Sequence, residues 1–301
     1  MALRSTSTRL ANSSRIDLAC SQIFLPLETM VLAQVSTSSS FFAAFSMRLT
    51  QSSISVSSCV FFSSSTFCRT TSARAIEMAA VANATGLRPA ATGLAFPPCG
   101  VDDLAQVLCP REDGGQLQHR GQVEVVSSVE RDGRPVFRDL RWGVYVTFAG
   151  DSDYVRRCFR EYGLVTDRSG NFTAMYKPYH LIGLELGISV ASVGLRREPT
   201  GAADAWHGDV VATAKRDLEA GETLDGEGGF TVYGRLMPSA DSLAIGGLPL
   251  GLAHHVRLKK RVPAGQPVRW SDVRIDAKDA AVAFRREMER AFGASGVSRR
   301  R

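Results

Sequence analysis

One short pattern occurs twice in the chain, as VATAKRDLEAGETL at residues 211–224 and as HVRLKKRVPAGQPV at residues 255–268. The offset is 44 residues (255 minus 211) throughout. Each copy contains a basic pair, an apolar residue, an Ala-Gly step and a second apolar residue, in that order. Because glycine adopts a positive φ without strain, the Ala-Gly steps predict tight turns between short strands. The repeat therefore predicts a small all-β domain with two related halves.

Glycines are dense between the two copies, and the second copy continues into a short turn, Trp270-Ser271-Asp272-Val273. Such glycine density favours tight bends between strands over a packed helix. The whole pattern resembles the SAF domain, a family that includes the C-terminal module of sialic-acid synthases, the type III antifreeze proteins and flagellar or pilus assembly chaperones. The resemblance covers about residues 205–276 and implies a β-clip fold.

Ahead of this module, two runs of residues alternate between apolar and polar side chains, as strands with one buried face do. The first run spans residues 123–129 and the second spans residues 144–148, with the turn dipeptide Asp132-Gly133 between them. We expect the two runs to form an antiparallel hairpin of a mixed sheet. A further strand is expected at residues 171–177, so the fold class is α+β.

Helices are expected at residues 76–85, 101–108, 153–162, 178–195 and 279–292. The stretch from Leu181 to Leu195 is apolar nearly all round, which is typical of a central, buried helix. Two other helices carry an apolar stripe at three- and four-residue spacing. The stripes are Tyr154, Val155, Cys158, Phe159 and Tyr162 in the first, which Asp151 or Ser152 can cap, and Ala281, Phe284 and Met288 in the second, which we expect to dock on the core.

Four polar residues gather where the chain turns into the long apolar helix: Tyr176, Lys177, His180 and Glu185. A carboxylate in an apolar helix needs a partner or a raised pKa. The group therefore has the composition of an active-site edge that holds a proton donor. The alternative is that Glu185 faces solvent while Lys177 and His180 line a solvated helix start.

A second polar stretch, Arg138-Asp139-Leu140-Arg141-Trp142, precedes the apolar strand at 144–148. Arg141 is the candidate in it for binding an anionic substrate. Structural ion pairing of the same arginine is an equally good interpretation.

The middle region is similar to the catalytic half of homoserine-dehydrogenase-like, SAF-containing NAD(P)-dependent oxidoreductases. The similar segments read GQVEVVSSVERDGRPVFRDLRWGVYVTF, YVRRCFREYGLVTD and MYKPYHLIGLELGISVAS. In such proteins a Rossmann domain comes first, then an α+β domain, then SAF. By its place in the YKPYH segment, Lys177 is implied as the acid/base, and we expect His180 and Glu185 to tune it. Arg141 and Tyr176 are the expected substrate-binding residues.

The sequence departs from that family at two points. No GxGxxG motif follows a strand near the N-terminus, so we expect no cofactor-binding residues. The Asp-Leu-x-Gly-x-Asp and Lys signature of true homoserine dehydrogenases is also missing, so homoserine is not implied as substrate. We therefore expect a truncated oxidoreductase that binds neither NAD nor NADP alone, although intact relatives use one of them. Whether this chain is an active enzyme is left open.

Charge and composition limit the partners. Of the net charge of +6, residues 1–75 hold +4 (six Arg against two acids) and the rest holds +2 (30 basic against 28 acidic residues). A nearly neutral body argues against a nucleic-acid partner. The six cysteines lack metal-ligand spacing, and no apolar run is long enough to span a membrane. We expect a small-molecule substrate, no metal and a cytoplasmic location, and we leave a homo-oligomer open.

Residues 1–75 differ in kind from the rest, with 19 Ser, 8 Thr and only two acids, Asp17 and Glu28. Such a stretch cannot bury enough apolar surface to offset the entropy of ordering, so we expect a disordered leader. We expect it to be a stretch translated from outside the true gene, either upstream of the real start or across a frameshift. An organellar transit peptide, whose composition it shares and which would make the location organellar, is the first alternative. A natural disordered tail is another, and a secretory signal is disfavoured because Asp17 and Glu28 interrupt its apolar stretch.

The sequence thus divides into a leader at 1–75, an α+β oxidoreductase catalytic-like domain at 76–204, a SAF β-clip domain at 205–276, and a C-terminal helix and tail at 277–301. Two functions fit this division. The first is a truncated homoserine-dehydrogenase-like oxidoreductase for a small hydroxy or keto substrate. The alternative is a non-enzymatic SAF-domain binding or assembly-chaperone protein that recognises a carbohydrate or a protein partner.

Overall fold

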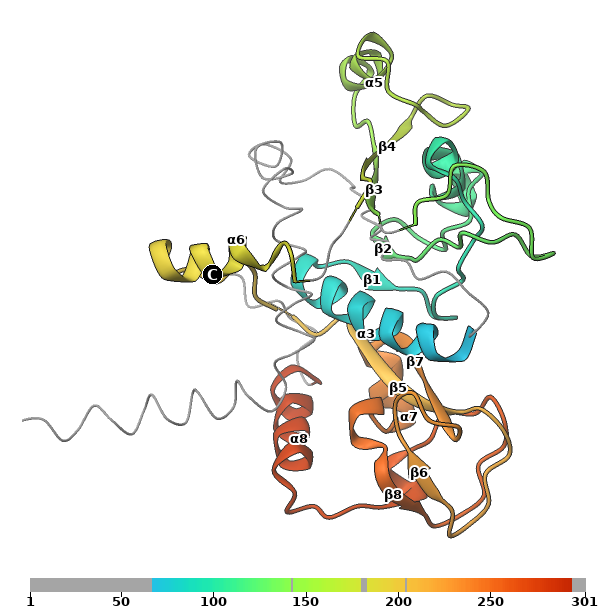
Figure 1. Cartoon of the computed structure of the whole chain (residues 1–301), viewed down its shortest axis with the longest axis vertical. Helices are drawn as coiled ribbons and strands as arrows, with labels where there is room; N and C mark the ends of the chain where they lie inside the picture. The colour runs from blue at the N-terminus through green and yellow to red at the C-terminus, as the bar shows by residue number, and fades with distance from the viewer. Residues whose placement is uncertain (1–66, 142, 180–182, 204, 294–301) are drawn as a thin grey trace, which may run out of the picture.

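The computed structural model describes residues 67–141, 143–179, 183–203 and 205–293 (Figure 1). Three predictions lie outside these residues: the disordered leader as far as residue 66, the role of His180, and the tail after residue 293. The predicted leader extends to residue 75, and this part of the prediction is wrong, because residues 67–75 belong to a helix. Within the described residues, helices and short strands are mixed and the sheets have two or three strands, which confirms the α+β class. No helix in the described ranges has the length and apolar character that crossing a membrane requires.

Helix α3 (Phe67–Thr85) lies across the middle of the molecule, between the catalytic-like part and the SAF part (Figure 1). It begins nine residues before the predicted start at 76 and ends where predicted, just before Gly86. Ala75, Met78 and Ala82 are buried in a core cluster that also contains Val123 and the SAF residue Leu236. Helix α3 therefore belongs to a core that contains residues of both the catalytic-like part and the SAF part.

The catalytic-like part contains two small sheets. In the first, β1 (Arg88–Pro89) pairs in parallel with β2 (Gln122–Val123), and in the second, β3 (Val144–Ala149) pairs antiparallel with β4 (Phe172–Lys177). The expected hairpin between 123–129 and 144–148 is therefore wrong. The two runs do not pair, because residues 129–135 close a tight turn on themselves, with Glu130 N donating to Arg134 O at 2.7 Å.

The predicted short helix at 101–108 is present as a 3-10 turn (Val101–Asp103) followed by α4 (Leu104–Val107), and a second 3-10 turn spans Arg111–Asp113. Helix α5 (Asp153–Glu161) begins after Ser152, whose Oγ accepts from Val155 N at 3.3 Å, as predicted for this cap. Its Phe159 packs edge-on against Phe148, with 5.7 Å between ring centroids. Tyr154 and Tyr162 of the predicted stripe are exposed instead, because only the Phe159 side faces the β3–β4 sheet.

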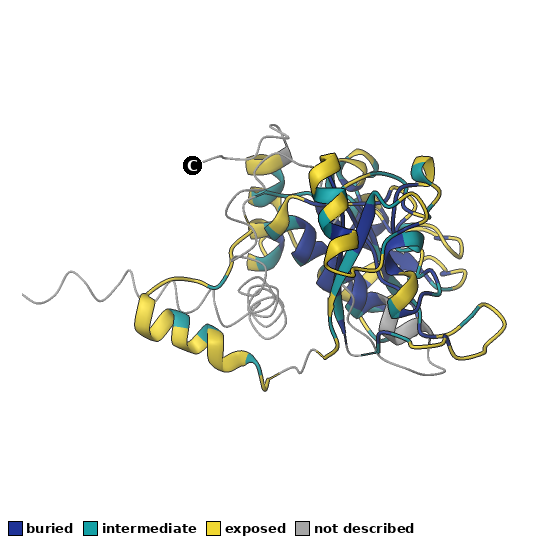
Figure 2. Ribbon diagram, turned by 90° about the horizontal axis from the view of Figure 1, so that it is seen from above, coloured by how far each residue is buried: buried dark blue, intermediate teal, exposed yellow. Residues whose placement is uncertain are grey.

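The long apolar helix departs most from expectation. It is present as α6 (Leu186–Ala191) and a following π-helix, η3 (Ser192–Arg196), but it is exposed rather than central and buried. It projects from the body, and its surface is mostly solvent-facing in Figure 2. The helix begins at Leu186 and not at residue 178 as predicted. None of the described core clusters contains one of its residues.

The SAF part contains β5 (Gly208–Ala214) paired antiparallel with β7 (Val232–Pro238), and a three-stranded sheet in the order β6 (Thr223–Asp225), β8 (His254–Leu258), β9 (Val273–Arg274). Helix α7 (Ser239–Ile245) and 3-10 turns at Leu250–Leu252 and Trp270–Asp272 connect the strands. A separate core of buried aliphatic residues fills this part. The predicted all-β module is therefore present, with one short helix inserted.

The sequence repeat appears as an approximate internal two-fold symmetry. Leu218 and Val262, which are 44 residues apart, exchange both backbone hydrogen bonds at 2.9 Å. Other backbone bonds come in pairs that the 44-residue offset interconverts. These are Ala214 N to Gln266 O (3.0 Å) with Leu258 N to Glu222 O (2.8 Å), and Gly265 N to Ala214 O (2.8 Å) with Gly221 N to Leu258 O (2.9 Å).

Helix α8 (Ala280–Gly293) docks on the SAF part, but not by the predicted stripe. Phe284 is 60% exposed, whereas Val282 is buried. Arg285 donates to both carboxylate oxygens of Asp209, at 2.9 and 2.7 Å, and its guanidinium lies 4.7 Å from the centroid of the Trp206 ring. The Arg285–Asp209 contact therefore fixes α8 in an orientation that is rotated about its axis by about one residue position. The face that contains Val282 and Arg285 packs on the SAF part, in place of the predicted stripe.

Candidate active site

The predicted polar group forms around the end of β4. Lys177 is the last residue of this strand, and its Nζ donates to Glu185 Oε1 across the turn that leads to α6. The side chain of Glu185 is mostly buried, at 14% exposed, while that of Lys177 keeps 31% exposure. The carboxylate thus holds an ammonium group that solvent and small molecules can still reach.

One tyrosine contacts this ion pair. The ring of Tyr179, which is 54% exposed, lies 5.5 Å from Lys177 Nζ, close enough for a cation–π contact. Tyr176 is 42% exposed but directly precedes Lys177 on β4, and successive side chains of a strand point to opposite faces of the sheet. The Tyr179 ring and the ammonium therefore give one surface that can contact a small molecule, and the predicted binding residue Tyr176 lies on the other face of β4.

Arg141 lies near the same strand end. Val144 pairs with Lys177, and a Cβ placed on Gly143 would lie 3.0 Å from the Lys177 carbonyl oxygen, so the 139–143 turn touches the end of β4. Arg141 Nη2 donates to Asp139 Oδ2 at 2.8 Å. The structural ion pair that the sequence left open is therefore present. Nε of Arg141 is buried with no hydrogen-bond partner among the described residues.

Glu124, which the sequence argument missed, is the acid with the largest change in pKa among the carboxylates of this part. Burial raises the pKa of its side chain to about 7. Four donors oppose that rise by hydrogen bonding to the carboxylate: Val125 N (2.9 Å), Ala95 N (3.0 Å), Phe96 N (3.3 Å) and Gln122 Nε2 (3.3 Å). These hydrogen bonds join the 90–97 loop to the chain at the end of β2. This structural role accounts for the burial of Glu124.

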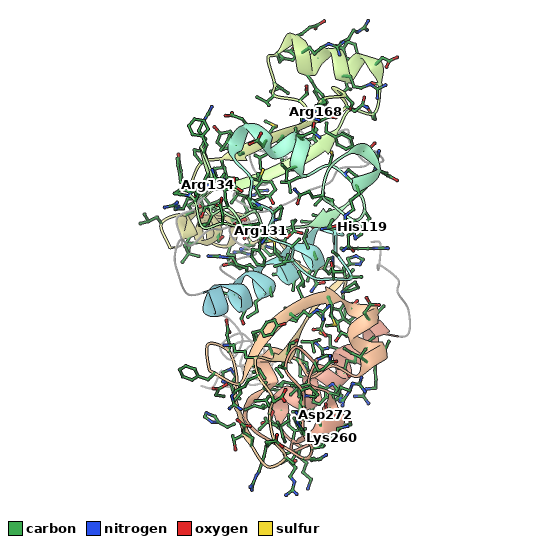
Figure 3. The ribbon with its side chains drawn as sticks, turned by 90° about the vertical axis from the view of Figure 1, so that its right-hand side faces the viewer. His119, Arg131, Arg134, Arg168, Lys260 and Asp272 are labelled. Atoms are coloured by element: carbon green, nitrogen blue, oxygen red, sulfur yellow. The ribbon has the colours of Figure 1, made fainter. Side chains whose placement is uncertain are left out.

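The SAF part holds a second compact charged pair, Lys260 and Asp272, which lie together in Figure 3. Lys260 Nζ is 2.9 Å from Asp272 Oδ1, and Arg269 N donates to Asp272 Oδ2 at 2.9 Å. Burial works against ionisation of Asp272, but these bonds and that from Ser271 hold its pKa below the usual range. The pair closes the turn that starts β9, so it stabilises the fold.

A dinucleotide site needs a glycine-rich strand-to-helix turn and a helix N-terminus open to a pyrophosphate. Two strand-to-helix connections among the described residues could in principle supply one. At the β3-to-α5 turn, Ser152 already caps the helix, and Asp151 and Asp153 add negative charge. At the β7-to-α7 junction, the helix follows Pro238 with no loop at all. Neither connection fits a dinucleotide.

Across the described residues, no three His, Cys, Asp or Glu side chains come together in a way that could hold a metal ion. Cys99, Cys109 and Cys158 are free thiols. Burial raises the pKa of Cys99 to about 12 and also raises the pKa of Cys109, so neither of these two buried thiols is activated as a nucleophile.

Models of two known families match parts of this chain. A model of the oxidoreductase DRL catalytic domain matches residues 62–186, and a model of the SAF domain matches residues 209–274. Among curated proteins, none matches this chain. The chain is thus similar to an oxidoreductase catalytic domain in its first match and to a SAF domain in its second, in the predicted order. Lys177, Glu185, Tyr176 and Arg141 all lie inside the first match.

Proposed function

We propose that this chain is the catalytic and SAF portion of a homoserine-dehydrogenase-like, NAD(P)-dependent oxidoreductase for a small hydroxy or keto substrate. The observation that carries the proposal is the Lys177–Glu185 pair, which lies inside the stretch similar to an oxidoreductase catalytic domain. Oxidation of an alcohol and reduction of a ketone both need a group that takes or gives the proton on the substrate oxygen. Lys177 is the side chain here that can do so.

The two residues have separate roles. Lys177 Nζ is reachable from solvent and holds the proton that passes to or from the substrate oxygen. Glu185 is largely buried and keeps the ammonium at the strand end, where the Tyr179 ring lies beside it. Tyr176, on the neighbouring strand position, is the proposed second substrate-binding residue with Arg141. Arg141 lies on the adjoining turn and supplies positive charge for an acidic substrate group. His180 completes the proposed catalytic group.

The nucleotide-binding domain of the proposed enzyme lies outside the described residues, since neither strand-to-helix turn described above fits a dinucleotide. Titration of the purified chain with NADH and with NADPH, followed by cofactor fluorescence, is expected to give no saturable binding. Saturable binding by the chain alone would show that this part of the proposal is wrong.

The substrate site has its own test. A panel of short-chain hydroxy and keto acids is screened against the full chain by ligand-observed NMR, and the hits are titrated. Lys177→Met is expected to weaken their binding by about tenfold or more, because it removes the charge that meets the substrate oxygen. Lys259→Met, at an exposed lysine of the SAF part, is the matched control and should leave binding unchanged. Equal binding by both variants would rule out the proposed role of Lys177.

One observation favours the alternative, a non-enzymatic SAF-domain binding protein. A groove of about 570 Å³ lies between α8 and residues 270–277, and its lining includes Trp270, Ile275, Val282, Arg286 and Arg290. The Arg286 guanidinium lies 3.8 Å over the Trp270 ring, so a carbohydrate or a peptide would meet the two arginines and the aliphatic side chains there. If an oligosaccharide or peptide panel binds the chain and Ala283→Trp, which fills the groove, abolishes that binding, the alternative gains over the enzyme.

A further inference from the structure

Lys177 lies where the backbone is held on both sides. In the sheet it pairs with Val144 of β3. Pro178 follows, and the proline ring fixes its own φ and restricts the residue before it to an extended backbone. Tyr179 comes next, so its position relative to Lys177 depends on few backbone torsions. The backbone therefore brings these two side chains together at the end of β4.

The side chain of Lys177 needs restraints of its own. It is a flexible four-carbon stem that ends in an ammonium group, and 31% of the side chain is exposed. Its Nζ donates to Glu185 Oε1. This hydrogen bond fixes how far Nζ lies from the carboxylate, but the ammonium can still swing around the oxygen. Glu185 alone therefore does not determine where the other N–H groups point.

The ring of Tyr179 supplies a second restraint. Its centroid lies 5.5 Å from Lys177 Nζ, and the negative face of an aromatic ring attracts a cation. Within the ranges that the structure describes, the Glu185 carboxylate and this ring are the two groups that attract the ammonium. They take up two of its sides. Because an ammonium group has three N–H donors, one donor stays available on the exposed side.

Proton transfer depends on such an arrangement. A proton passes between a lysine and a substrate oxygen when the two groups are within hydrogen-bond reach of each other. A lysine that is already held in place before the substrate arrives loses less entropy when the substrate binds. A contact that orders Lys177 should therefore strengthen the binding of a hydroxy or keto compound.

We propose that Tyr179 is a positioning residue of this site. Its ring and the Glu185 carboxylate together hold Lys177 so that one N–H faces the substrate oxygen. The inference rests on the proposed function, because it takes Lys177 as the group that exchanges the proton. Since the ring makes the contact with Nζ, phenylalanine at position 179 can replace tyrosine, whereas an aliphatic side chain cannot.

The order of the ammonium can be measured in the full chain without any ligand. The chain has five lysines, so lysine labelled with ¹³C at Cε gives five signals, and Lys177→Met identifies the signal of Lys177. NMR relaxation of Cε measures how tightly the end of each lysine is held. In the wild type, Lys177 is expected to be more ordered than the exposed Lys278 and to show a nuclear Overhauser effect to the Tyr179 ring.

Two variants separate the ring from the hydroxyl. Tyr179→Leu is expected to lower the order of the Lys177 Cε group to that of Lys278, and Tyr179→Phe should leave it as in the wild type. For the hydroxy and keto acids that bind the wild type, Tyr179→Leu should raise Kd by about fivefold or more and Tyr179→Phe by less than about twofold. Tyr179 is 54% exposed, so both variants should fold, which circular dichroism checks.

The matched control is Tyr162→Leu. Tyr162 is 80% exposed at the end of α5, and α5 follows the end of β3 that lies away from Lys177 (Figure 1). This variant should change neither the order of the Lys177 Cε group nor the binding of the acids.

Three results would overturn the proposal. The first is a Tyr179→Leu variant in which Lys177 stays as ordered as in the wild type. The second is a Tyr179→Leu variant that loosens Lys177 without weakening the binding of the acids. The third is a Tyr179→Phe variant that behaves like Tyr179→Leu, since the hydroxyl would then act in place of the ring. If the wild type binds none of the acids, the proposed function fails, and the relaxation data still confirm or overturn the contact that holds Lys177.

Discussion

At the scale of single residues, Glu124 makes the stability of the fold depend on pH. Burial raises its pKa from the ordinary 4.5 to about 7. Between these values the folded chain binds a proton that the unfolded chain has lost, so this residue contributes stability below pH 4.5 that is lost as the pH rises through 7. The carboxylates of Asp167, Asp225 and Asp272 have lowered pKa values. They therefore contribute stability at neutral pH that is lost as the pH falls into the acidic range below this window.

Glu124→Gln isolates this effect, because the variant keeps the volume and cannot ionise. Between pH 5 and pH 8, the wild type is expected to lose about 3 kcal/mol of unfolding free energy relative to the variant, as follows from a change of about 2.5 units in one pKa. Urea denaturation at each pH measures the difference. A difference between the two proteins that does not vary with pH would contradict the expectation.

Asp209 provides a second prediction at this scale. Its carboxylate is 7% exposed and receives two bonds from Arg285 and one from Ser242. Removal of the guanidinium by Arg285→Leu leaves a buried charge without its main partner, and we expect the free energy of unfolding to fall by about 3 kcal/mol.

The neighbouring Arg286→Leu is the control for this change. Arg286 is half-exposed over the Trp270 ring and should cost less than about 1 kcal/mol. Both variants are compared by urea unfolding at one pH. Equal losses in the two variants would mean that Asp209 does not depend on Arg285.

Residue types and spacing were enough to predict that Lys177 and Glu185 belong together, because an acid in an apolar helix needs a nearby cation. The same reasoning missed Glu124. In Val123-Glu124-Val125-Val126 the acid occupies a polar place in an alternating pattern, which predicts a solvent-facing side chain. The structure buries it because the 90–97 loop folds over it and supplies backbone donors, and no local pattern reports a contact about 30 residues away.

At the scale of elements, the repeated turn of the SAF part makes a paired prediction. Gly221 and Gly265 hold equivalent positions, with φ of 88° and 76°. Alanine at either place is strained by the left-handed backbone, so Gly221→Ala and Gly265→Ala should each cost about 1–2 kcal/mol. Thermal unfolding measures both. Gly251→Ala is the control, because Gly251 lacks a positive φ and a Cβ there meets nothing within 4 Å. A large difference between the first two variants would contradict the equivalence of the turns.

Elements differed in how well the sequence predicted them. The SAF module follows from its sequence because each turn depends on residues a few positions apart. The run at 144–148 is a strand, β3, as predicted, whereas only Val123 of the run at 123–129 belongs to a strand. Alternation also does not identify the partner strand, and β3 pairs with β4. In α6, hydrophobicity predicts a central, buried helix, and that prediction is wrong. An apolar composition does not determine whether other elements pack against a helix, and none of the described core clusters includes this one.

At the scale of the whole molecule, α3 joins the two parts that the sequence separates. Asn83 Oδ1 accepts from His207 N at 2.7 Å and Gly208 N at 2.9 Å, and Ser72 Oγ accepts from Gly234 N at 2.9 Å. The helix also shares a core with Leu236 of β7. The boundary near residue 204 therefore marks a change of sequence family, whereas the packing is continuous across it.

Continuous packing predicts that the catalytic-like and SAF parts unfold together. Met78→Ala opens a cavity in the shared core and should cost about 2–5 kcal/mol. Leu258→Ala does the same inside the SAF core. In calorimetry, both variants are expected to lower the midpoint of a single transition, with equal calorimetric and van't Hoff enthalpies. Hydrogen exchange then measures amide protection in the two parts separately, at β4 in the catalytic-like part and at β7 in the SAF part. If Met78→Ala weakens protection at β4 and leaves β7 as in the wild type, the parts are independent and α3 does not couple them.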